Sequence, residues 1–541
     1  MAEQTLWYKN AVFYEVNVRA FYDSNADGHG DIPGLILKLD YLKDLGVDCL
    51  WLLPIYGSPL RDDGYDISDY YQIQPSFGTL EDFKRLVSEV HNRGMRIIMD
   101  LVLNHTSDMH PWFQSARSDR SSPYRDYYVW SDTDEKYNQT RIIFIDTEKS
   151  NWTWDEKAGQ YFWHRFYSTQ PDLNYDNPAV QQEMLNVMRY WLDFGVDGFR
   201  ADAVPYLFER EGTNCENLPE THQFLKHIRQ VIDSEYPGRI LLCEANQWPE
   251  DVRPYFGDGD EFQLGFHFPA MPRIFKSLRC GDGSSLIDII NRTPAIPENC
   301  QWCTFLRNHD ELTLEMVTED ERQWMWQEFA PEPRMRLNLG IRRRLAPLLD
   351  NNPKLIILAY SLLFTLPGSP IIYYGDEIGM GDNIWLPDRN GCRTPMQWSN
   401  DLNAGFSEAS ENMLFNPVVH EQPFDPAHVN VETQSSNPES LLSQIKRLIS
   451  IRKSHPVISN GTFEWLSSGE NNCVLELRRS NETEELIAIH NLTPIDKKAR
   501  LAFEGCQYVD LLTGNEFDSS LGGNFHINLS PYQTCWLLRR I

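Results

Sequence analysis

The feature that most restricts the fold of this chain is a regular alternation between short apolar segments and longer amphipathic segments. Eight apolar segments have the β-branched and aromatic composition of buried strands. Helical patterns lie between them, for example at residues 79–94, 178–195 and 221–238, and each of these ends in Gly. The alternation predicts an α/β fold, a TIM-type (β/α)8 barrel of parallel strands. The predicted strands are residues 11–22, 47–56, 95–105, 196–204, 239–246, 261–268, 303–310 and 369–379.

Two regions interrupt the alternation and predict further domains. One follows the third strand, is rich in Trp, Tyr, Ser and Asp, and has no helical period. The other follows a last helical pattern at 440–456 and consists of short alternating runs, which predict an antiparallel β domain. The predicted boundaries are 1–104 and 173–456 for the barrel, 105–172 for the inserted domain and 457–541 for the C-terminal domain.

The charge of the chain restricts its partners. A net charge of −29 disfavours binding to nucleic acid or to an anionic membrane, and no apolar stretch reaches the ~18 residues of a membrane span. A neutral, hydroxyl-rich small molecule suits such a chain better, and no organic cofactor is indicated. The 10 cysteines form no paired C-x-x-C motifs and no export signal is visible, so we expect reduced thiols and a cytoplasmic protein.

The segment DSNADGHGD alternates oxygen-bearing side chains in the manner of a calcium loop. An EF-hand would need a Glu at the twelfth loop position, which is Gly34 here, and the loop follows a predicted strand, not a helix. The spacing therefore predicts a separate Ca²⁺ or Mg²⁺ site, and the alternative is a turn stabilised by its own Asp and Asn side chains. The predicted ligands are Asp23, Asn25, Asp27, the carbonyl of His29, and Asp31.

Polar and charged groups stand at the C-terminal ends of four predicted strands. In a parallel barrel these ends meet on one face, where the reactive residues of such barrels lie. One such carboxylate alone would be a solvated surface charge, but four strand ends that all carry such groups predict one shared site. The groups are Asn104 with His105, Arg200 with Asp202, Glu244, and His309 with Asp310.

These carboxylates suit chemistry at a glycosidic bond. A retaining mechanism uses one carboxylate as nucleophile and a second carboxyl, roughly 5–5.5 Å away, as acid and then base. Asp202 and Glu244 end neighbouring strands and are predicted to form this pair. Burial and a nearby carboxylate would raise the pKa of Glu244, while Arg200 would keep Asp202 ionised.

The segments DLVLNH (100–105), GFRADAV (198–204) and FLRNHD (305–310), with the strand end at Glu244, resemble the α-amylase superfamily, glycoside hydrolase family 13. The resemblance extends over essentially the whole chain. It implies a domain B inserted after the third strand and a C-terminal β-sandwich. It also implies Asp202 as nucleophile, Glu244 as general acid/base and Asp310 as transition-state stabiliser, with His105, Arg200 and His309 holding the sugar.

Further motifs concern the non-reducing end of the substrate. In RDDGYD (61–66) the resemblance implies that Asp62 binds a terminal glucose and that Tyr65 stacks on its ring. The segment QPDLN, which begins at Gln170, is similar to the oligo-1,6-glucosidase group and adds Gln170 to the sugar-binding residues.

The segment RNGCRTPMQW (389–398) implies that the pocket is closed at one end. In the family the Arg of this motif, here Arg393, pairs with the aspartate of the preceding motif, here Asp62. A bidentate Arg–carboxylate wall would exclude longer glucans and admit a disaccharide. The alternative is a surface ion pair that contributes little.

Several longer segments resemble the members of this family that interconvert maltose and trehalose. The implied activity is a reversible intramolecular glucosyl transfer with minor hydrolysis, in a pocket that loops 206–222 and 376–398 close against water. Ala201 departs from the larger residue that often precedes the nucleophile. The segments that carry the resemblance are 201–222, 244–261, 308–318, 338–349 and 367–385.

The same resemblance implies a structural Ca²⁺ between the barrel and the inserted domain, held only by oxygen ligands. The alternative for the acidic residues concerned is ordinary loop capping. The implied ligands are Asn104, Asp172, the carbonyls of Tyr206 and Leu207, and Glu209.

Three other functions remain open at this stage. An α-glucosidase or oligo-1,6-glucosidase would use the same pocket for hydrolysis, and a sucrose hydrolase or isomerase would accept a different disaccharide. A non-catalytic sugar-binding protein is a third reading, although the three acidic residues are all present. A homo-oligomer and a maltose kinase as partner are further open expectations.

Overall fold

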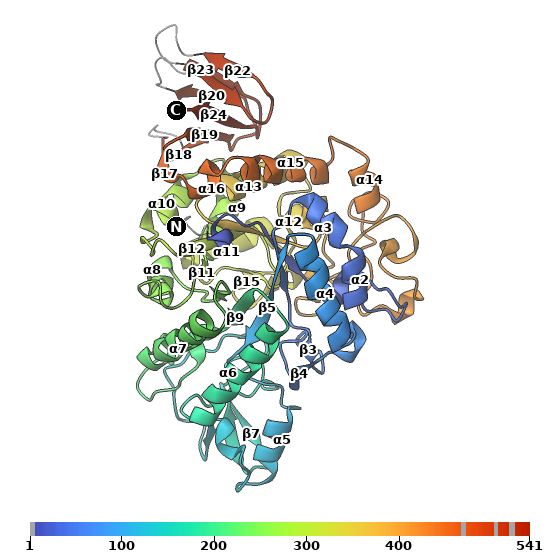
Figure 1. The fold of residues 1–541 in the computed structure, drawn as a ribbon, viewed down its shortest axis with the longest axis vertical. Coiled ribbons are helices and arrows are strands. Elements are labelled where there is room, and N and C mark those ends of the chain that lie inside the picture. Colours follow the sequence, from blue (N-terminus) through green and yellow to red (C-terminus); the bar gives the residue numbers. More distant parts are fainter. Residues whose placement is uncertain (1–5, 467–471, 502–506, 519–524) are drawn as a thin grey trace.

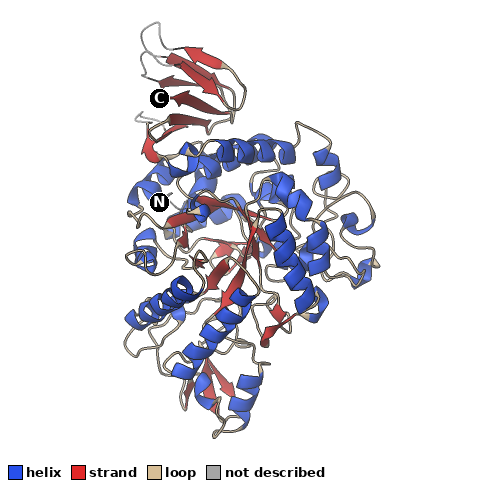
Figure 2. Cartoon of the chain, viewed as in Figure 1, coloured by secondary structure: helices blue, strands red, loops and turns tan. Residues whose placement is uncertain are grey.

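The computed structural model describes residues 6–466, 472–501, 507–518 and 525–541 (Figure 1). Three parts follow one another along its long axis. Strands of the C-terminal region lie at one end, the barrel with its surrounding helices in the middle, and the inserted segment with α5 (Pro111–Ser118) at the other end. Figure 2 shows that helices surround the central strands, whereas the C-terminal region is built of strands.

The central part is a closed barrel of eight parallel strands, which confirms the predicted α/β barrel. Seven predicted apolar segments each contain one of these strands, and the segment 303–310 overlaps the eighth, β12, which begins two residues earlier. Around the barrel the order is β1-β16-β12-β11-β10-β9-β5-β2. The strands are β1 (Phe13–Val16), β2 (Cys49–Leu52), β5 (Arg96–Val102), β9 (Gly198–Asp202), β10 (Ile240–Cys243), β11 (Leu264–Phe266), β12 (Gln301–Phe305) and β16 (Ser369–Tyr373).

Local sequence explains where the outer helices begin. At the start of α4 (Leu80–Asn92), the Thr79 hydroxyl accepts the backbone N–H of Asp82, and Asp82 accepts that of Thr79, which is a capping box. Helix α6 (Pro178–Asp193) begins with Pro after Asn177, whose side chain accepts a backbone N–H. Other helices that pack around the barrel are α2 (Ile32–Leu37), α3 (Leu39–Leu45), α7 (Pro219–Glu235), α9 (Ala270–Cys280), α10 (Ser284–Arg292), α13 (Pro353–Thr365) and α15 (Leu441–Ser454).

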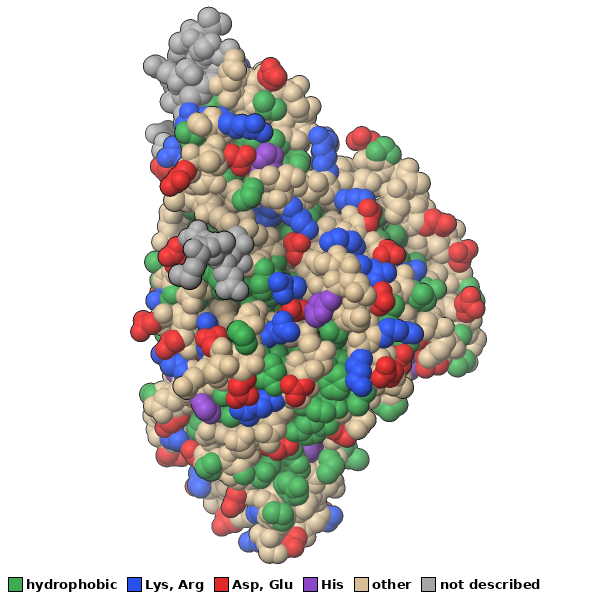
Figure 3. Space-filling model, viewed as in Figure 1, with side chains coloured by type: hydrophobic (Ala, Val, Ile, Leu, Met, Phe, Trp, Pro, Cys, Tyr) green, Lys and Arg blue, Asp and Glu red, His purple; other side chains and the backbone are tan. Residues whose placement is uncertain are grey.

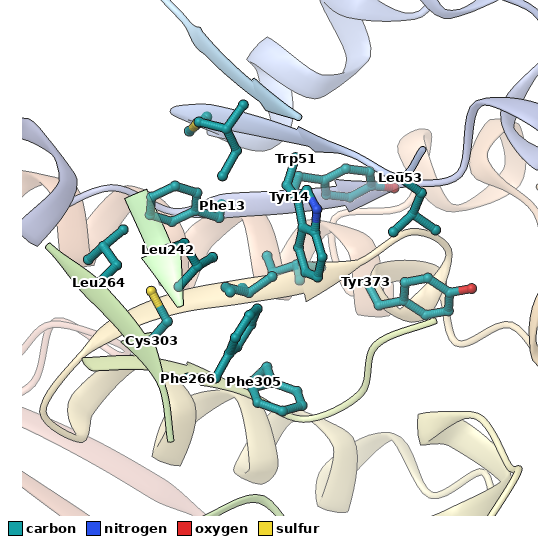
Figure 4. Packing of buried hydrophobic residues seen from close by; sticks show 14 of the residues in the cluster. Phe13, Tyr14, Trp51, Leu53, Leu242, Leu264, Phe266, Cys303, Phe305 and Tyr373 are labelled. Atoms are coloured by element: carbon teal, nitrogen blue, oxygen red, sulfur yellow. The ribbon is translucent and has the colours of Figure 1, made fainter. Parts of the chain in front are cut away.

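The interior of the barrel is filled by aromatic and aliphatic side chains from several strands (Figure 4). Trp51 of β2 packs against Phe266 of β11, with the ring centroids 5.6 Å apart. Trp51 also lies edge-on to the ring of His309, 5.9 Å away, so the core continues directly into the floor of the C-terminal face. Since these rings are buried, side chains that rest on them are held in fixed positions.

The inserted segment between β5 and α6 has more regular structure than its sequence pattern indicates. It contains α5 and a small sheet in the order β6-β8-β7, in which Phe113 stacks on Trp130 at 5.6 Å. An isolated bridge joins His105 to Asp172, so the two ends of the segment meet next to the barrel. The sheet consists of β6 (Trp130–Ser131), β7 (Trp152–Asp155) and β8 (Gln160–Trp163).

A second excursion, after β12, has no counterpart in the predicted elements. It contains α11 (Glu319–Phe329) and a small antiparallel sheet in the order β13-β15-β14. Thr318 and Glu321 cap the start of α11 reciprocally. The sheet consists of β13 (Leu312–Thr313), β14 (Arg336–Leu337) and β15 (Gly340–Ile341).

The C-terminal region forms two antiparallel sheets, one in the order β17-β18-β19-β24-β21-β22 and one of β20 and β23. A separate small core with Ile487, Ile527 and Leu537 lies between them. The strands are β17 (Thr462–Trp465), β18 (Val474–Ser480), β19 (Glu484–Asn491), β20 (Lys497–Leu501), β21 (Gln507–Asp510), β22 (Glu516–Asp518), β23 (Phe525–Leu529) and β24 (Thr534–Arg540).

The surface and the thiols are also described. On the face shown in Figure 3, Lys and Arg side chains are interspersed with Asp and Glu. Within the described part of the chain, no helix is both long and apolar enough to cross a bilayer. The nine cysteines in the described ranges are all free.

Candidate active site

The three predicted catalytic carboxylates line one cavity at the C-terminal face of the barrel. Asp202 ends β9 and Glu244 directly follows β10, and the register pairs Cys243 with Ala201, so these residues are neighbours. Asp310 comes after β12. The cavity has a volume of about 120 Å³, which is small compared with the ~300–1,000 Å³ typical of ligand pockets. It therefore suits a small ligand.

Arg200 joins the carboxylates beneath the cavity. One guanidinium nitrogen lies 2.6 Å from Asp202 Oδ1 and the other lies 2.5 Å from Glu244 Oε1. Arg200 also pairs with buried Asp100, which accepts a hydrogen bond from Trp51 Nε1 at 3.0 Å. Because this arginine is 1% exposed, the rigid guanidinium fixes both carboxyl groups toward the same point.

The environment raises the pKa of both members of the pair. Burial raises the pKa of Asp202 to about 6, against the opposing effects of Arg200 and of a side-chain hydrogen bond with Glu244. Burial also raises the pKa of Glu244 to about 7, with Arg200 opposing and Asp202 adding to the shift. The pKa of Glu244 is thus the higher one, as an acid paired with a nucleophile requires.

Asp310 is held ionised by three cationic side chains. Burial alone would raise the pKa of Asp310, but His309, Arg389 and Arg393 hold it well below its ordinary value. The distances to its carboxylate oxygens are 3.2 Å from His309 Nε2, 2.9 Å from Arg389 Nε and 3.0 Å from Arg393 Nη2. A fixed negative charge in this position would stabilise positive charge on a nearby sugar ring.

The predicted pairing of Arg393 with Asp62 is wrong. Among the described ion pairs, those of Arg393 go to Asp63, at 3.6 Å, and to Asp310. Asp62 lines the cavity and instead accepts a hydrogen bond from Gln170 Nε2 at 2.8 Å. Gln170 is fully buried and thus positions Asp62 from behind the cavity wall.

Tyr65 and His105 both line the cavity. The Tyr65 ring stacks on His309 with centroids 5.3 Å apart, and its hydroxyl lies 2.9 Å from His309 Nε2. Burial lowers the pKa of His105 to about 3, so its imidazole is neutral. His105 Nε2 is buried without a hydrogen-bond partner, and it is free to bond a sugar hydroxyl.

Arg141 of the inserted segment contacts two side chains of the cavity wall, Tyr206 and Glu315. Its guanidinium lies 2.9 Å from Glu216, 2.5 Å from Glu315 and 3.3 Å from the Tyr206 hydroxyl. These partners come from the loop after β9 and from the excursion after β12. Arg141 therefore ties three separate segments together next to the cavity wall. The loop 376–398 contributes Arg389 to the cavity wall.

Sequence reasoning missed several residues of the cavity wall. Arg389 lies in the same RNGCRTPMQW segment as Arg393, so that motif carried a signal for it. Asn246 ends the predicted strand 239–246, Tyr206 was considered only for its backbone carbonyl, and the other side chains named here come from segments without a periodic pattern. The missed side chains include Phe144, Phe166, Tyr206, Asn246, Glu311, Glu315 and Arg389.

The predicted calcium ligands with side-chain oxygens lie close together. Asn104 lies two residues after the end of β5. Asp172 pairs with His105 in the isolated bridge that closes the inserted segment. One oxygen each of Asn104, Asp172 and Glu209 is buried without a hydrogen-bond partner. Burial raises the pKa of Asp172 to about 8, and burial together with Asp172 raises that of Glu209 well above its ordinary value. Tyr206 and Leu207 precede Glu209 in the same turn.

The loop that holds the second predicted metal site is stabilised by its own side chains. Asp23 accepts backbone N–H groups of Asn25, Ala26 and Gly28, at 2.8 to 3.0 Å. Asn25 and Asp27 accept the backbone N–H groups of Asp27 and His29, and Asp31 caps α2. These contacts are those of the alternative, a loop of Asx turns, and the second ion stays a prediction.

Comparisons with known proteins agree with this arrangement. The model of the alpha-amylase catalytic domain matches residues 16–331 and 342–461. The chain is 58% identical to a trehalose synthase/amylase of Mycobacterium tuberculosis, over 90% of this chain and 82% of that protein. It is 53% identical to a trehalose synthase of Pimelobacter sp., over 99% of this chain and 96% of that protein.

A solved structure has the same fold over nearly the whole length. The crystal structure of a trehalulose synthase from Pseudomonas mesoacidophila superposes with a TM-score of 0.80 at 27% identity, covering 98% of this chain and 99% of that chain. An oligo-1,6-glucosidase of Parageobacillus thermoglucosidasius is 32% identical, over 91% of each chain.

Proposed function

The chain belongs to the α-amylase family, and we propose that it interconverts maltose and trehalose by transferring a glucosyl group within one closed cavity. The two relatives at 58% and 53% identity are named for trehalose synthesis, and the glucosidase relative is less similar, at 32%. The observation that carries the proposal is the placement of Asp202 and Glu244 on one buried guanidinium in a small cavity, whose wall residue Glu315 is held by Arg141 of the inserted segment.

The first step breaks the bond between the two glucose units of maltose. Glu244 donates its proton to the bridging oxygen, and the C1–O bond breaks as an Asp202 oxygen bonds to C1. Asp310 lies where its negative charge stabilises the oxocarbenium-like ring. The products of the step are a glucosyl ester on Asp202, an ionised Glu244 and one glucose held in the cavity.

The second step forms trehalose from the same two units. The held glucose turns so that its anomeric hydroxyl gives its proton to Glu244 and its oxygen attacks C1 of the ester. The bond from C1 to Asp202 breaks, and the carboxylate is restored. Two displacements at C1 give net retention, so the donor carbon keeps its α configuration. The same steps in reverse return maltose.

Water must be kept from the glucosyl ester, because hydrolysis would release two glucose molecules. Liquid water would compete with the held glucose unless the cavity stays shut. The three-way contact of Arg141 supports a closed mouth. Replacing Arg141 with Ala is expected to raise the fraction of turnovers that end in glucose several-fold while maltose is still consumed.

The measurement is the ratio of glucose to trehalose by chromatography after a single addition of maltose. Arg120→Ala is the matched control, since Arg120 lies in the same inserted segment and bonds only the carbonyls of Ala158 and Gly159. An unchanged ratio in Arg141→Ala would contradict the role of the bridge.

The cluster of Asn104, Asp172 and Glu209 fits a calcium ion. Each of the three side chains has a buried oxygen without a partner, and two of these oxygens belong to carboxylates whose proximity is unfavourable when both are ionised. An oxygen-only ligand set of this kind suits Ca²⁺. A bound ion would neutralise these carboxylates and fix the junction next to His105.

Calcium removal is therefore expected to make stability depend on pH. In the unfolded chain Asp172 ionises near pH 4, whereas in the folded chain without the ion its pKa is about 8. The folded state then holds the extra proton between these values, so stability falls as the pH rises from 4 to 8. With EGTA we expect the melting temperature to fall as the pH is raised from 5 to 8. With calcium we expect it to stay constant over the same range.

Asp172→Asn is the matched variant, because it keeps the shape and removes one charge. It should lose the calcium response and the part of the pH-dependent drop that Asp172 contributes, while buried Glu209 keeps a raised pKa. Equal melting curves with EGTA and with calcium for the parent protein would contradict the site.

The proposed reaction is tested by incubating the protein with maltose and separating the products. Trehalose as the main product supports the proposal, and the reverse reaction should yield maltose from trehalose. Glucose alone would favour the hydrolase. No turnover of either disaccharide would favour a sugar-binding protein.

The free cysteines support a reducing compartment, and we place the reaction in the cytoplasm.

A further inference from the structure

A second buried acid, Glu15, touches the active site from below. Glu15 lies in β1, its side chain is fully buried, and it does not line the cavity. One oxygen, Oε1, accepts two hydrogen bonds from the same residue. These come from the backbone N–H of His309 at 3.0 Å and from His309 Nδ1 at 2.6 Å. A buried carboxylate of this kind is costly unless it is paired, so the contact is a specific one.

His309 is surrounded by negative charge. Its other ring nitrogen, Nε2, lies 3.2 Å from Asp310 Oδ2. Burial by itself would lower the pKa of His309, but Asp310 and Glu15 raise it to about 10. Arg393 Nε donates to the backbone carbonyl of His309 at 2.9 Å. The titratable and charged groups that face His309 are Glu15, Asp310, Asp100, Glu244, Tyr65 and Arg393.

We propose that Glu15 is a positioning residue that keeps His309 charged, with a proton on each ring nitrogen, throughout the reaction. Nδ1–H donates to Glu15, and in the charged ring Nε2–H can donate to Asp310 and to the Tyr65 hydroxyl. A neutral ring that keeps the Nδ1 proton would present the lone pair of Nε2 to Asp310. Only the doubly protonated ring satisfies Glu15 and Asp310 together.

The inference deepens the proposed function, on which it rests, because it assigns the origin of a cation in the glucosyl-binding site. With His309 charged, Asp310 stays ionised around pH 7, where Glu244 titrates. The stabilising charge and the proton donor are then available together. A strand residue outside the cavity thereby sets the electrostatics of the step.

The test replaces Glu15 with Gln, which keeps an oxygen that can accept both hydrogen bonds but removes the charge. At low pH His309 is protonated in either protein, so at pH 5 the variant should retain turnover within about twofold of the parent. Above the lowered pKa of His309 the variant should fall behind, by roughly tenfold or more at pH 8. The quantity plotted is the ratio of the two kcat values against pH.

Two controls make the result specific. Glu15→Asp keeps a carboxylate, so the ratio of its kcat to that of the parent should depend less on pH than the ratio for Glu15→Gln. Glu377→Gln removes a comparable buried carboxylate, bonded to the Tyr14 and Tyr41 hydroxyls at 2.8 and 2.7 Å, away from His309. Its ratio to the parent should not change with pH. A ratio for Glu15→Gln that is equally low at every pH would mean a merely structural role and would overturn the proposal.

A direct measurement covers the case in which Glu15→Gln does not fold. The parent protein is labelled with ¹³C at Cε1 of histidine, and the signal of His309 is assigned by its loss in His309→Asn. An imidazolium chemical shift retained at pH 8 is expected, and a neutral shift there would overturn the proposal. An active parent with a neutral His309 would sink only this inference, whereas a parent inactive on maltose would sink the proposed function.

Discussion

Asp202→Asn is expected to reduce turnover of maltose and of trehalose by a factor on the order of 10⁴ or more, because no glucosyl ester can form. The amide is isosteric and can still contact Arg200, so binding should survive. Kinetic assays of both directions and calorimetric titration with maltose would show the loss in kcat with little change in affinity.

A suitable control lies at the other end of the same strand. Asp197, just before β9, is buried and pairs with Arg96 and Arg239 at 3.0 and 3.1 Å. Asp197→Asn disturbs an ion-pair network of similar size away from the cavity and should leave kcat nearly unchanged in the folded protein. If Asp202→Asn kept a tenth of the parent rate, Asp202 would not be the nucleophile.

Glu244→Gln is expected to reduce turnover of maltose by about 10²- to 10⁴-fold, the usual contribution of a general acid. The loss should depend on the leaving group. An aryl glucoside whose phenol leaves as an anion needs no proton, so the variant should still form the glucosyl ester from it and release a burst of phenol. The following step, which needs a base, should remain slow.

The pH profile of the parent gives a second check on the same residue. Glu244 must be protonated and its pKa is about 7, while Asp202 must be ionised and its pKa is about 6. The rate of maltose conversion should therefore rise through pH 6 and fall above pH 7. The assignment of Glu244 as the acid would be contradicted if Glu244→Gln reacted with the aryl glucoside as slowly as with maltose. It would also be contradicted if the rate of the parent protein still rose at pH 9.

The barrel could be predicted from the sequence because its signal is repeated and local. Seven of the eight strands lie within the predicted apolar segments, β12 overlaps the remaining one, and the capped helices follow. The strand ends at Asp202, Glu244 and Asp310 were predictable for the same reason, since a closed barrel fixes where those ends meet. Their convergence is a geometric consequence of strand order.

The wall of the cavity was less predictable, because it is built by loops that have no periodic pattern. Arg141 and Phe144 lie in the inserted segment, and Glu315 lies in an excursion whose sheet the sequence did not indicate. Arg393 was assigned the wrong carboxylate, since Asp62 and Asp63 are adjacent and only coordinates show which one faces the arginine. Local spacing does not decide such long-range pairings.

The shared guanidinium beneath Asp202 and Glu244 has a consequence for proton flow. While both carboxyls are free, Asp202 repels negative charge on Glu244 and so raises its pKa. Once Asp202 is esterified, that repulsion is lost, whereas Arg200 still lowers the pKa of Glu244. Glu244 therefore loses its proton readily while the ester forms. It is protonated again only when the ester is broken. The pKa of Glu244 thus depends on whether Asp202 carries the glucosyl group.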